Sequence, residues 1–323
     1  MNRVLSIHFA AAALLTLAGP ALAQTYPTKP IQLIIPQAPG GGSDTIGRFI
    51  AEKLAERLGQ PVIVENRPGA AGTLGAEFVK RAQPDGYTLL LGAIDTITAP
   101  MVNSGVSLNA LKDFAPVTQL AQSPNVWVVS PSFEGKTLSD LVRIAKERPM
   151  KIDFASSGVG SMQHLGGELL NQMAGIKLAH VPYKGGPPGF ADVIGGRVPA
   201  MLSGFQGALP QVQSGKVRAV AVTDTKRSKA LPDVPTVEEA LNLPGYQAMN
   251  WQALFFPAST PQPVVNRVAD EVIAILGMKD TKAKLEALGY EPIGNTPAQF
   301  AKVMESEQAK WSKLVKSAGI SSN

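Results

Sequence analysis

The stretch Ile31-Gln-Leu-Ile-Ile-Pro-Gln-Ala-Pro-Gly-Gly-Gly-Ser43 joins a strand to a helix. Its first five residues are almost wholly apolar, as in a buried strand. A glycine-rich loop follows, and Ser43 is a residue type that caps a helix N-terminus. Apolar residues then recur at helical spacing, at positions Ile46, Phe49, Ile50, Leu54 and Leu58. The stretch therefore predicts a strand, a turn and an amphipathic helix in succession.

The same succession of strand and helix recurs along the chain. Further helices are expected at 73–82, 138–146 and 162–173, and the capping box Thr296-Pro-Ala-Gln299 opens a last one. Alternation at this spacing indicates an α/β fold, with parallel sheets covered by helices on both faces. Further strands are expected at 62–64, 87–91, 125–129, 152–155, 178–181, 200–202 and 217–222.

The first residues have the composition of an export signal. Arg3 precedes a short apolar run at 7–17, and Ala21-Leu22-Ala23 is the small-x-small pattern that signal peptidase cleaves. The run is shorter than the ~20 residues that cross a bilayer. We therefore expect residues 1–23 to be removed, leaving an exported chain that begins at Gln24.

The composition excludes several kinds of site. The 323 residues include no cysteine, so disulfides, thiolate catalysis and cysteine-held metals are ruled out. Beyond the signal only His164 and His180 remain, too few for a multi-histidine metal site. The net charge is +5, and the basic residues are scattered along the chain; their densest cluster, 226–229, is short. We therefore expect no cofactor, no metal and no nucleic-acid partner.

Motifs of common enzymes are also absent. The chain has no Gly-x-Ser-x-Gly and no His-Glu-x-x-His segment. Gly135-Lys136-Thr137 resembles the end of a P-loop, but Ser130 replaces the required first glycine. A hydrolytic enzyme with His164 beside a serine and an acid stays open as an alternative. The residues favour binding over catalysis.

The loop 38–44 is suited to an anion. Its three glycines let the backbone approach a ligand, and the helix start offers free N–H groups with a partial positive charge. A Cβ at Gly41 is expected to block this approach. The alternative is a plain glycine-rich connection that binds no ligand. Asp44 is expected first to stabilise the helix through its dipole, and only second to contact a ligand. The candidates here are Pro39, Gly40, Gly41, Ser43 and Asp44.

A second strand-to-helix junction, at 156–161, gathers hydroxyl groups. Its candidates are Ser156, Ser157, Gly158 and Ser161. His164 lies off the apolar stripe of the following helix, which leaves it to solvent or to a cleft. Further on, Tyr183 is able to donate a hydrogen bond to a carboxylate. Lys184 fits an ordinary exposed turn.

Seven ordered motifs closely resemble the Bug family, the receptors of tripartite tricarboxylate transporters, over essentially the whole exported chain. They are Tyr26-Pro-Thr-Lys-Pro-Ile31, the Pro-Gly-Gly-Gly loop, Val64-Glu-Asn-Arg-Pro-Gly69, Pro84-Asp-Gly-Tyr-Thr88, Lys112-Asp-Phe-Ala-Pro-Val117, Val181-Pro-Tyr-Lys-Gly-Gly186 and Ala230-Leu-Pro-Asp-Val-Pro-Thr236.

The resemblance implies a type II periplasmic-binding-protein fold. Its two α/β lobes would comprise 24–124 plus 248–323 and 125–247, with the ligand in the cleft between them. It further implies a periplasmic, monomeric receptor that delivers a small organic acid to transporter membrane subunits. A receptor for a membrane signalling kinase would share these features. The loops that would line the cleft add the candidates Gln37, Asp95, Thr96, His164, Tyr183, Gly185 and Phe205.

Some residues depart from the family pattern. Gln37 replaces a common aromatic residue, and 201–205 lacks the Asp-Asn pair of many members. With few acidic groups at hand, an ammonium would lack a partner. The sequence thus favours a plain carboxylic acid, a dicarboxylate or an aromatic acid, whose apolar body touches Met162 or Phe205.

Overall fold

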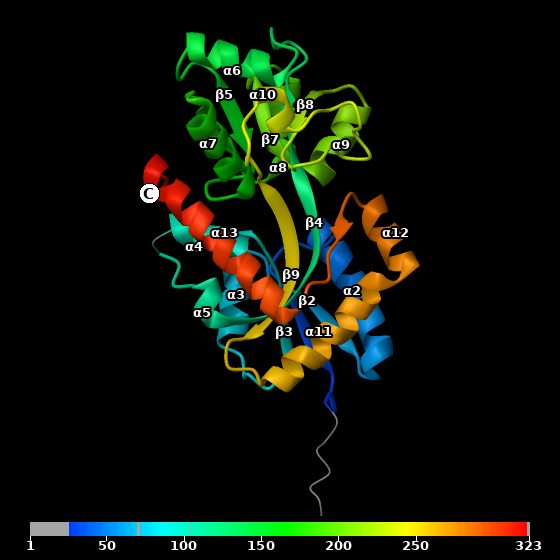
Figure 1. Ribbon diagram of the computed structural model, residues 1–323. Helices are drawn as coiled ribbons and strands as arrows, with labels where there is room; N and C mark the ends of the chain where they lie inside the picture. The colour runs from blue at the N-terminus through cyan, green and yellow to red at the C-terminus, as the bar shows by residue number, and fades with distance from the viewer. Residues whose placement is uncertain (1–25, 70–71, 104, 322–323) are drawn as a thin grey trace, which may run out of the picture.

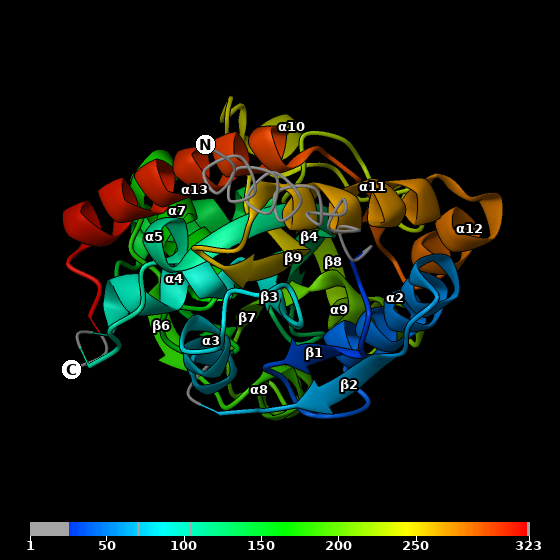
Figure 2. The same cartoon turned by 90° about the horizontal axis from the view of Figure 1, so that it is seen from below.

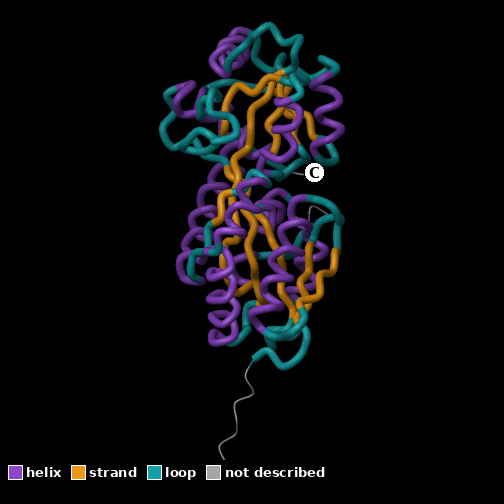
Figure 3. The backbone as a smooth tube through the Cα atoms, turned by 90° about the vertical axis from the view of Figure 1, so that its right-hand side faces the viewer, coloured by secondary structure: helices purple, strands orange, loops and turns teal. Residues whose placement is uncertain are grey.

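The computed structural model describes residues 26–69, 72–103 and 105–321, so the predicted export signal lies outside the described residues. The chain folds into two α/β lobes, one above the other in Figure 1 and seen from the side in Figure 3. Within the described ranges, no helix is long and apolar enough to cross a membrane.

The first lobe confirms the strand, loop and helix predicted from the opening stretch. Strand β1 pairs in parallel with β2 and β3. Side chains from β1 and α2 share one buried core, which includes Ile31, Leu33, Ile46 and Leu54. The elements are β1 (Ile31–Ile35), α2 (Gly42–Leu58), β2 (Val62–Asn66), α3 (Thr73–Lys80), β3 (Thr88–Ala93), α4 (Asp95–Val102), α5 (Ala110–Asp113), α11 (Gln262–Gly277), α12 (Lys279–Ala287) and β10 (Glu291–Pro292).

The second lobe repeats the strand–helix plan. Strand β5 pairs in parallel with β6 and β7. Its elements are α6 (Leu138–Glu147), β5 (Asp153–Ser156), α7 (Met162–Ala174), β6 (Ala179–Pro182), α8 (Gly186–Ile194), β7 (Ala200–Gly204), α9 (Phe205–Gln213), β8 (Arg218–Val222) and α10 (Val237–Leu241).

Two long strands connect the lobes, and they add antiparallel pairs to the parallel sheets that the sequence predicts. Strands β4 (Phe114–Val129) and β9 (Met249–Pro257) pair antiparallel in the middle of Figure 1. One carries the chain into the second lobe and the other brings it back, so they must run in opposite directions. The sheet order is β2-β1-β3-β9-β4-β7-β5-β6.

The last helix, α13 (Pro297–Ala318), crosses from one lobe to the other. It packs on β4 and on α4 and reaches α7 of the second lobe, as Figures 1 and 2 show. The predicted capping box at its start is confirmed, because Thr296 and Gln299 each cap the other's backbone N–H. The predicted cap Ser43 is wrong. Gly41 is the N-cap of α2, without a side-chain hydrogen bond, and Ser43 lies inside the helix.

Candidate functional site

The loops that follow the parallel strands meet between the lobes. Strand β3 runs antiparallel to β9, which descends from the second lobe, so β3 ends at the edge facing that lobe. Strand β7 runs antiparallel to the ascending β4, so β7 and its parallel neighbour β5 end facing the first lobe. The starts of α2, α4, α7 and α9 therefore border one inter-lobe space.

The start of α2 is closely packed but keeps free backbone donors. The first N–H groups of a helix have no partner within it. Gly40 has φ +82°, where glycine is favoured, and a Cβ on Gly42 would lie 2.7 Å from the Tyr290 hydroxyl. A Cβ on Gly41 would only meet the Ala38 carbonyl oxygen at 3.6 Å. Among the three loop glycines, Gly42 therefore has the least room for a side chain.

Asp44 supports this loop from within. It accepts hydrogen bonds from the Gly40 N–H (2.9 Å), Arg48 Nε (3.1 Å) and Asn66 Nδ2 (2.9 Å). The Arg48 hydrogen bond contributes most to lowering the pKa of Asp44 to about 2. Asp44 is thus an ionised, fully engaged part of the loop.

Sequence reasoning missed Gln252 and Tyr290. Gln252 of β9 is only 7% exposed, and its Nε2 donates to Ser43 Oγ (3.0 Å) and to the Tyr290 hydroxyl (3.3 Å). Its Oε1 has no partner among the described residues. Asn250 lies two residues earlier, on the same side of the strand, and donates to Asn125 Oδ1 (2.7 Å), as does Gln163 (2.7 Å). The crossing strands thus give the cleft a polar wall.

The serine loop is largely satisfied by its own contacts. Ser156 is fully buried and lies 2.6 Å from His180 Nε2, and Ser157 donates to Gln163 Oε1 (2.5 Å). Ser161 caps α7 by accepting from the His164 N–H (3.2 Å). The Ser156–His180 pair is closed to solvent at the hydroxyl, which does not suit a hydrolytic nucleophile.

The expectation that His164 faces solvent or a cleft is wrong. Its side chain is buried and stacks on His180 with ring centroids 3.7 Å apart. Its Nδ1 accepts a hydrogen bond from the Gly160 N–H (3.1 Å). The apolar stripe of α7 did not reveal that β6 would place a second imidazole against this helix. His164 is a packing residue beneath the serine loop.

These histidines should make the protein acid-sensitive. Burial lowers the pKa of His164 to about 4, and burial with the nearby His164 lowers that of His180 to about 3. Histidine in the unfolded chain binds a proton near pH 6.5, whereas these two do so only at lower pH in the folded protein. The free energy of unfolding should therefore fall as the pH drops below 6.5, by about 1.4 kcal/mol per pH unit for each histidine. We expect NMR titration to show both imidazoles neutral at pH 5.5. An imidazole that titrates near pH 6.5 would contradict this.

Ser161→Ala is expected to act on stability through α7. The hydroxyl is the helix cap, so its loss should lower the free energy of unfolding by about 1 kcal/mol. Ser161→Asn, which restores a capping side chain, should recover most of that loss in urea denaturation. If Ser161→Ala is as stable as wild type, the Ser161 hydroxyl does not stabilise the start of α7.

The remaining second-lobe candidates lie around α8 and α9. Tyr183 donates to Asp192 Oδ2 (2.6 Å), and Arg197 donates to the other oxygen (2.7 Å), so a hydrogen bond to a ligand would have to replace an existing one. Gly185 is the N-cap of α8 with φ +94°. Phe205 is buried at the start of α9 and packs on Gly289 of the first lobe.

A groove of about 560 Å³ lies between the lobes beside Phe205. Lys226 of the second lobe pairs with Glu291 of the first across it (2.7 Å), and Lys229 lies 3.9 Å from Glu286. Gly160 packs on α4 elsewhere in the inter-lobe space. The lobes are therefore in contact at two places around the cleft.

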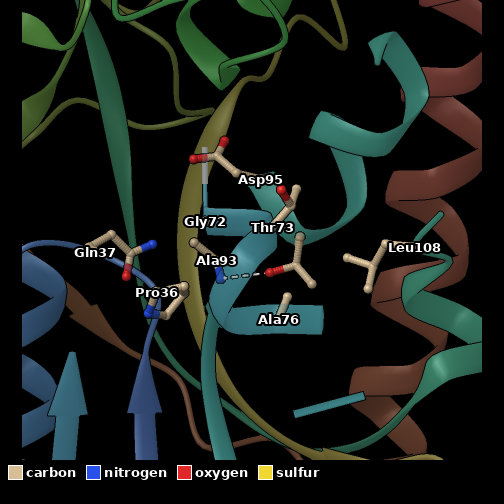
Figure 4. A pocket seen from close by; sticks show the side chains of 9 residues that line it. Pro36, Gln37, Gly72, Thr73, Ala76, Ala93, Asp95 and Leu108 are labelled. Atoms are coloured by element: carbon tan, nitrogen blue, oxygen red, sulfur yellow. Dashed lines mark hydrogen bonds between the residues drawn. The ribbon is translucent and has the colours of Figure 1, made fainter. Parts of the chain in front are cut away.

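Asp95, Thr96 and Gln37 line one small cavity of the first lobe, shown in Figure 4. Thr96 Oγ1 accepts from the Ala93 N–H (3.3 Å), the dashed contact of the figure. Gln37 Oε1 is buried without a partner among the described residues. Burial raises the pKa of Asp95 to about 6, against the opposing effect of the Met162 N–H of α7.

Known proteins share this architecture. Residues 46–320 match the family model described as tripartite tricarboxylate transporter family receptor. Protein BugT of Bordetella pertussis is 34% identical over 325 residues, which cover 99% of this chain and 98% of BugT.

Two similar solved structures contain an organic acid. R. palustris Rpa4515 with adipate has 34% identity and a TM-score of 0.81, over 92% of this chain and 99% of that one. MatC (Rpa3494) from Rhodopseudomonas palustris with bound malate has 32% identity and a TM-score of 0.77, over 90% of this chain and 100% of that one.

Proposed function

Because this chain belongs to the receptor family of tripartite tricarboxylate transporters, as its motifs indicated, we propose that it captures a small organic carboxylate and delivers it to the membrane subunits of such a transporter. It would act in the periplasm as a monomer, after cleavage of residues 1–23. The relatives with adipate and malate support a carboxylate as the ligand.

The observation that carries this proposal is the start of α2. Its unpaired N–H groups belong to the first lobe and border the space that faces the second lobe, beside the buried amide of Gln252. Backbone donors and the helix dipole together favour a carboxylate there. The candidate contacts of the glycine loop act through backbone, which explains why the loop needs little side chain.

We propose the lobe bounds 24–124 plus 248–323 and 125–247, and a hinge where they meet. The pairing of β4 supports them: Pro124 pairs with Met249 of β9, whereas Asn125 pairs with Gly204 of β7. Within the described ranges the chain crosses between the lobes in β4 and in β9, and α13 packs on both lobes, so a rotation would bend at these links. A ligand that touches both lobes would favour the closed arrangement.

Calorimetric titration of the protein with a panel of organic acids tests the proposal. We expect micromolar or tighter binding of at least one carboxylate, about −8 kcal/mol or better. Mass spectrometry of the released ligand should recover the same acid. Failure of every acid to bind would refute the receptor role, and recovery of a converted product would favour an enzyme.

A further inference from the structure

Asp95 is a carboxylate at the inter-lobe edge without a cation. It is the first residue of α4, one residue beyond the end of β3, and Figure 4 shows it above the other labelled side chains that line the cavity. None of the ion pairs between described residues involves it. Burial raises its pKa to about 6, and the Met162 N–H is the donor that opposes this shift. A half-buried carboxylate in a cavity, with one N–H donor and no cation, is a candidate binding group.

Two further acceptors at this edge have no hydrogen-bond donor among the described residues. Gln37 Oε1 lines the same cavity as Asp95, and Gln252 Oε1 belongs to the residue that pairs with Ala93, two positions before Asp95. Gln252 is more than nine-tenths buried. Buried acceptors of this kind are normally hydrogen-bonded. An ammonium group carries three N–H donors and a positive charge. It would therefore supply both the hydrogen-bond donors and the cation that these oxygens do not have among the described residues.

The start of α7 is closed to a ligand anion. The Met162 N–H acts on the Asp95 carboxylate, and the His164 N–H is bonded to Ser161. A ligand carboxylate at the start of α7 would therefore have to displace Asp95 or Ser161 from these donors. A ligand carboxylate is left with the start of α2, and a second anion near Asp95 would be repelled.

We propose that Asp95 is a specificity-determining residue that selects a carboxylate bearing an ammonium group. The inference rests on the proposed receptor function. The carboxylate binds at the start of α2, and the ammonium faces Asp95 with Gln37 and Gln252 as further acceptors. The scarcity of acidic residues in the sequence favoured a plain acid, but one correctly placed carboxylate is enough to reverse that preference.

Matched ligand pairs test this by calorimetry at pH 7.5, where Asp95 is ionised. Suitable pairs are succinate and aspartate, hexanoate and 6-aminohexanoate, and benzoate and 4-(aminomethyl)benzoate. We expect wild type to bind the amino member of at least one pair about tenfold tighter or more. Asp95→Asn should weaken that ligand about 100-fold and leave the plain acid unchanged or tighter. Asp224→Asn removes the same charge from the neighbouring groove and should preserve the preference.

The outcomes separate this inference from the function on which it rests. If wild type binds plain acids as tightly as their amino partners, or tighter, Asp95 is not selective while the carboxylate receptor stands. If Asp95→Asn weakens both members of a pair equally, Asp95 serves lobe contact alone and the inference is overturned. If no member of any pair binds wild type while another acid of the panel does, the inference is overturned and the receptor stands; if no acid of the panel binds, both fail. The comparison of paired ligands on the wild-type protein tests the inference even if the Asp95→Asn variant does not fold.

Discussion

Gly42→Val is expected to weaken binding of the organic acid by about 100-fold or more. A Cβ at this position would lie 2.7 Å from the Tyr290 hydroxyl, so either Tyr290, which holds Gln252, or the first turn of α2 must shift, and valine adds two further methyl groups. The start of α2 should then lose its geometry. Its N–H groups are the proposed donors to the carboxylate, and losing two charge-assisted hydrogen bonds costs about 3 kcal/mol. Calorimetric titration measures the loss directly.

Gly277→Val is the matched control for this variant. Gly277 lies in α11, outside the glycine loop, and a Cβ there would meet no atom within 4 Å. Its affinity should stay within a few fold of wild type. Equal affinity of wild type and Gly42→Val would show that the start of α2 is a connection and that the acid binds elsewhere.

Trp311→Ala is expected to lower the free energy of unfolding by about 3–5 kcal/mol. The indole is fully buried on α13, the helix that packs on α4 and also on α7 across the lobe boundary. Its removal leaves a cavity and deprives Glu307 of the hydrogen bond that it accepts from the indole N–H (2.5 Å).

Urea denaturation measures this effect, with Lys313→Ala as control. Lys313 is exposed on the same helix, so its replacement should change stability by no more than about 0.5 kcal/mol. Similar unfolding of wild type and Trp311→Ala would mean that α13 does not hold the lobes together.

The sequence was informative where structure is local. The apolar run at Ile31 and the helical stripe that begins at Ile46 predict β1 and α2, because both follow from the spacing of neighbouring residues. The capping box at Thr296 is equally local. The cap at Ser43 failed because the glycines before it allow the helix to begin at Gly42, two residues earlier than a cap at Ser43 would give.

Residues brought together over long distances were out of reach. Gln252 is 209 positions from Ser43, and only the return path of β9 makes them partners. Asn250 and Gln252 are polar residues at alternate positions of an otherwise apolar strand, a signal that would have identified one polar face. The burial of His164 depends on β6 in the same way, since periodicity along α7 carries no information about which strand covers it.

Small-angle X-ray scattering, with and without the acid that binds most tightly, tests lobe closure on a carboxylate most directly. The described conformation has inter-lobe contacts at Lys226–Glu291 and at Gly160, as a closed form should. We expect the radius of gyration to decrease on binding, because an acid held at the start of α2 that also touches the facing second lobe favours the closed arrangement. Tight binding of the acid with an unchanged radius of gyration would contradict closure between the lobes.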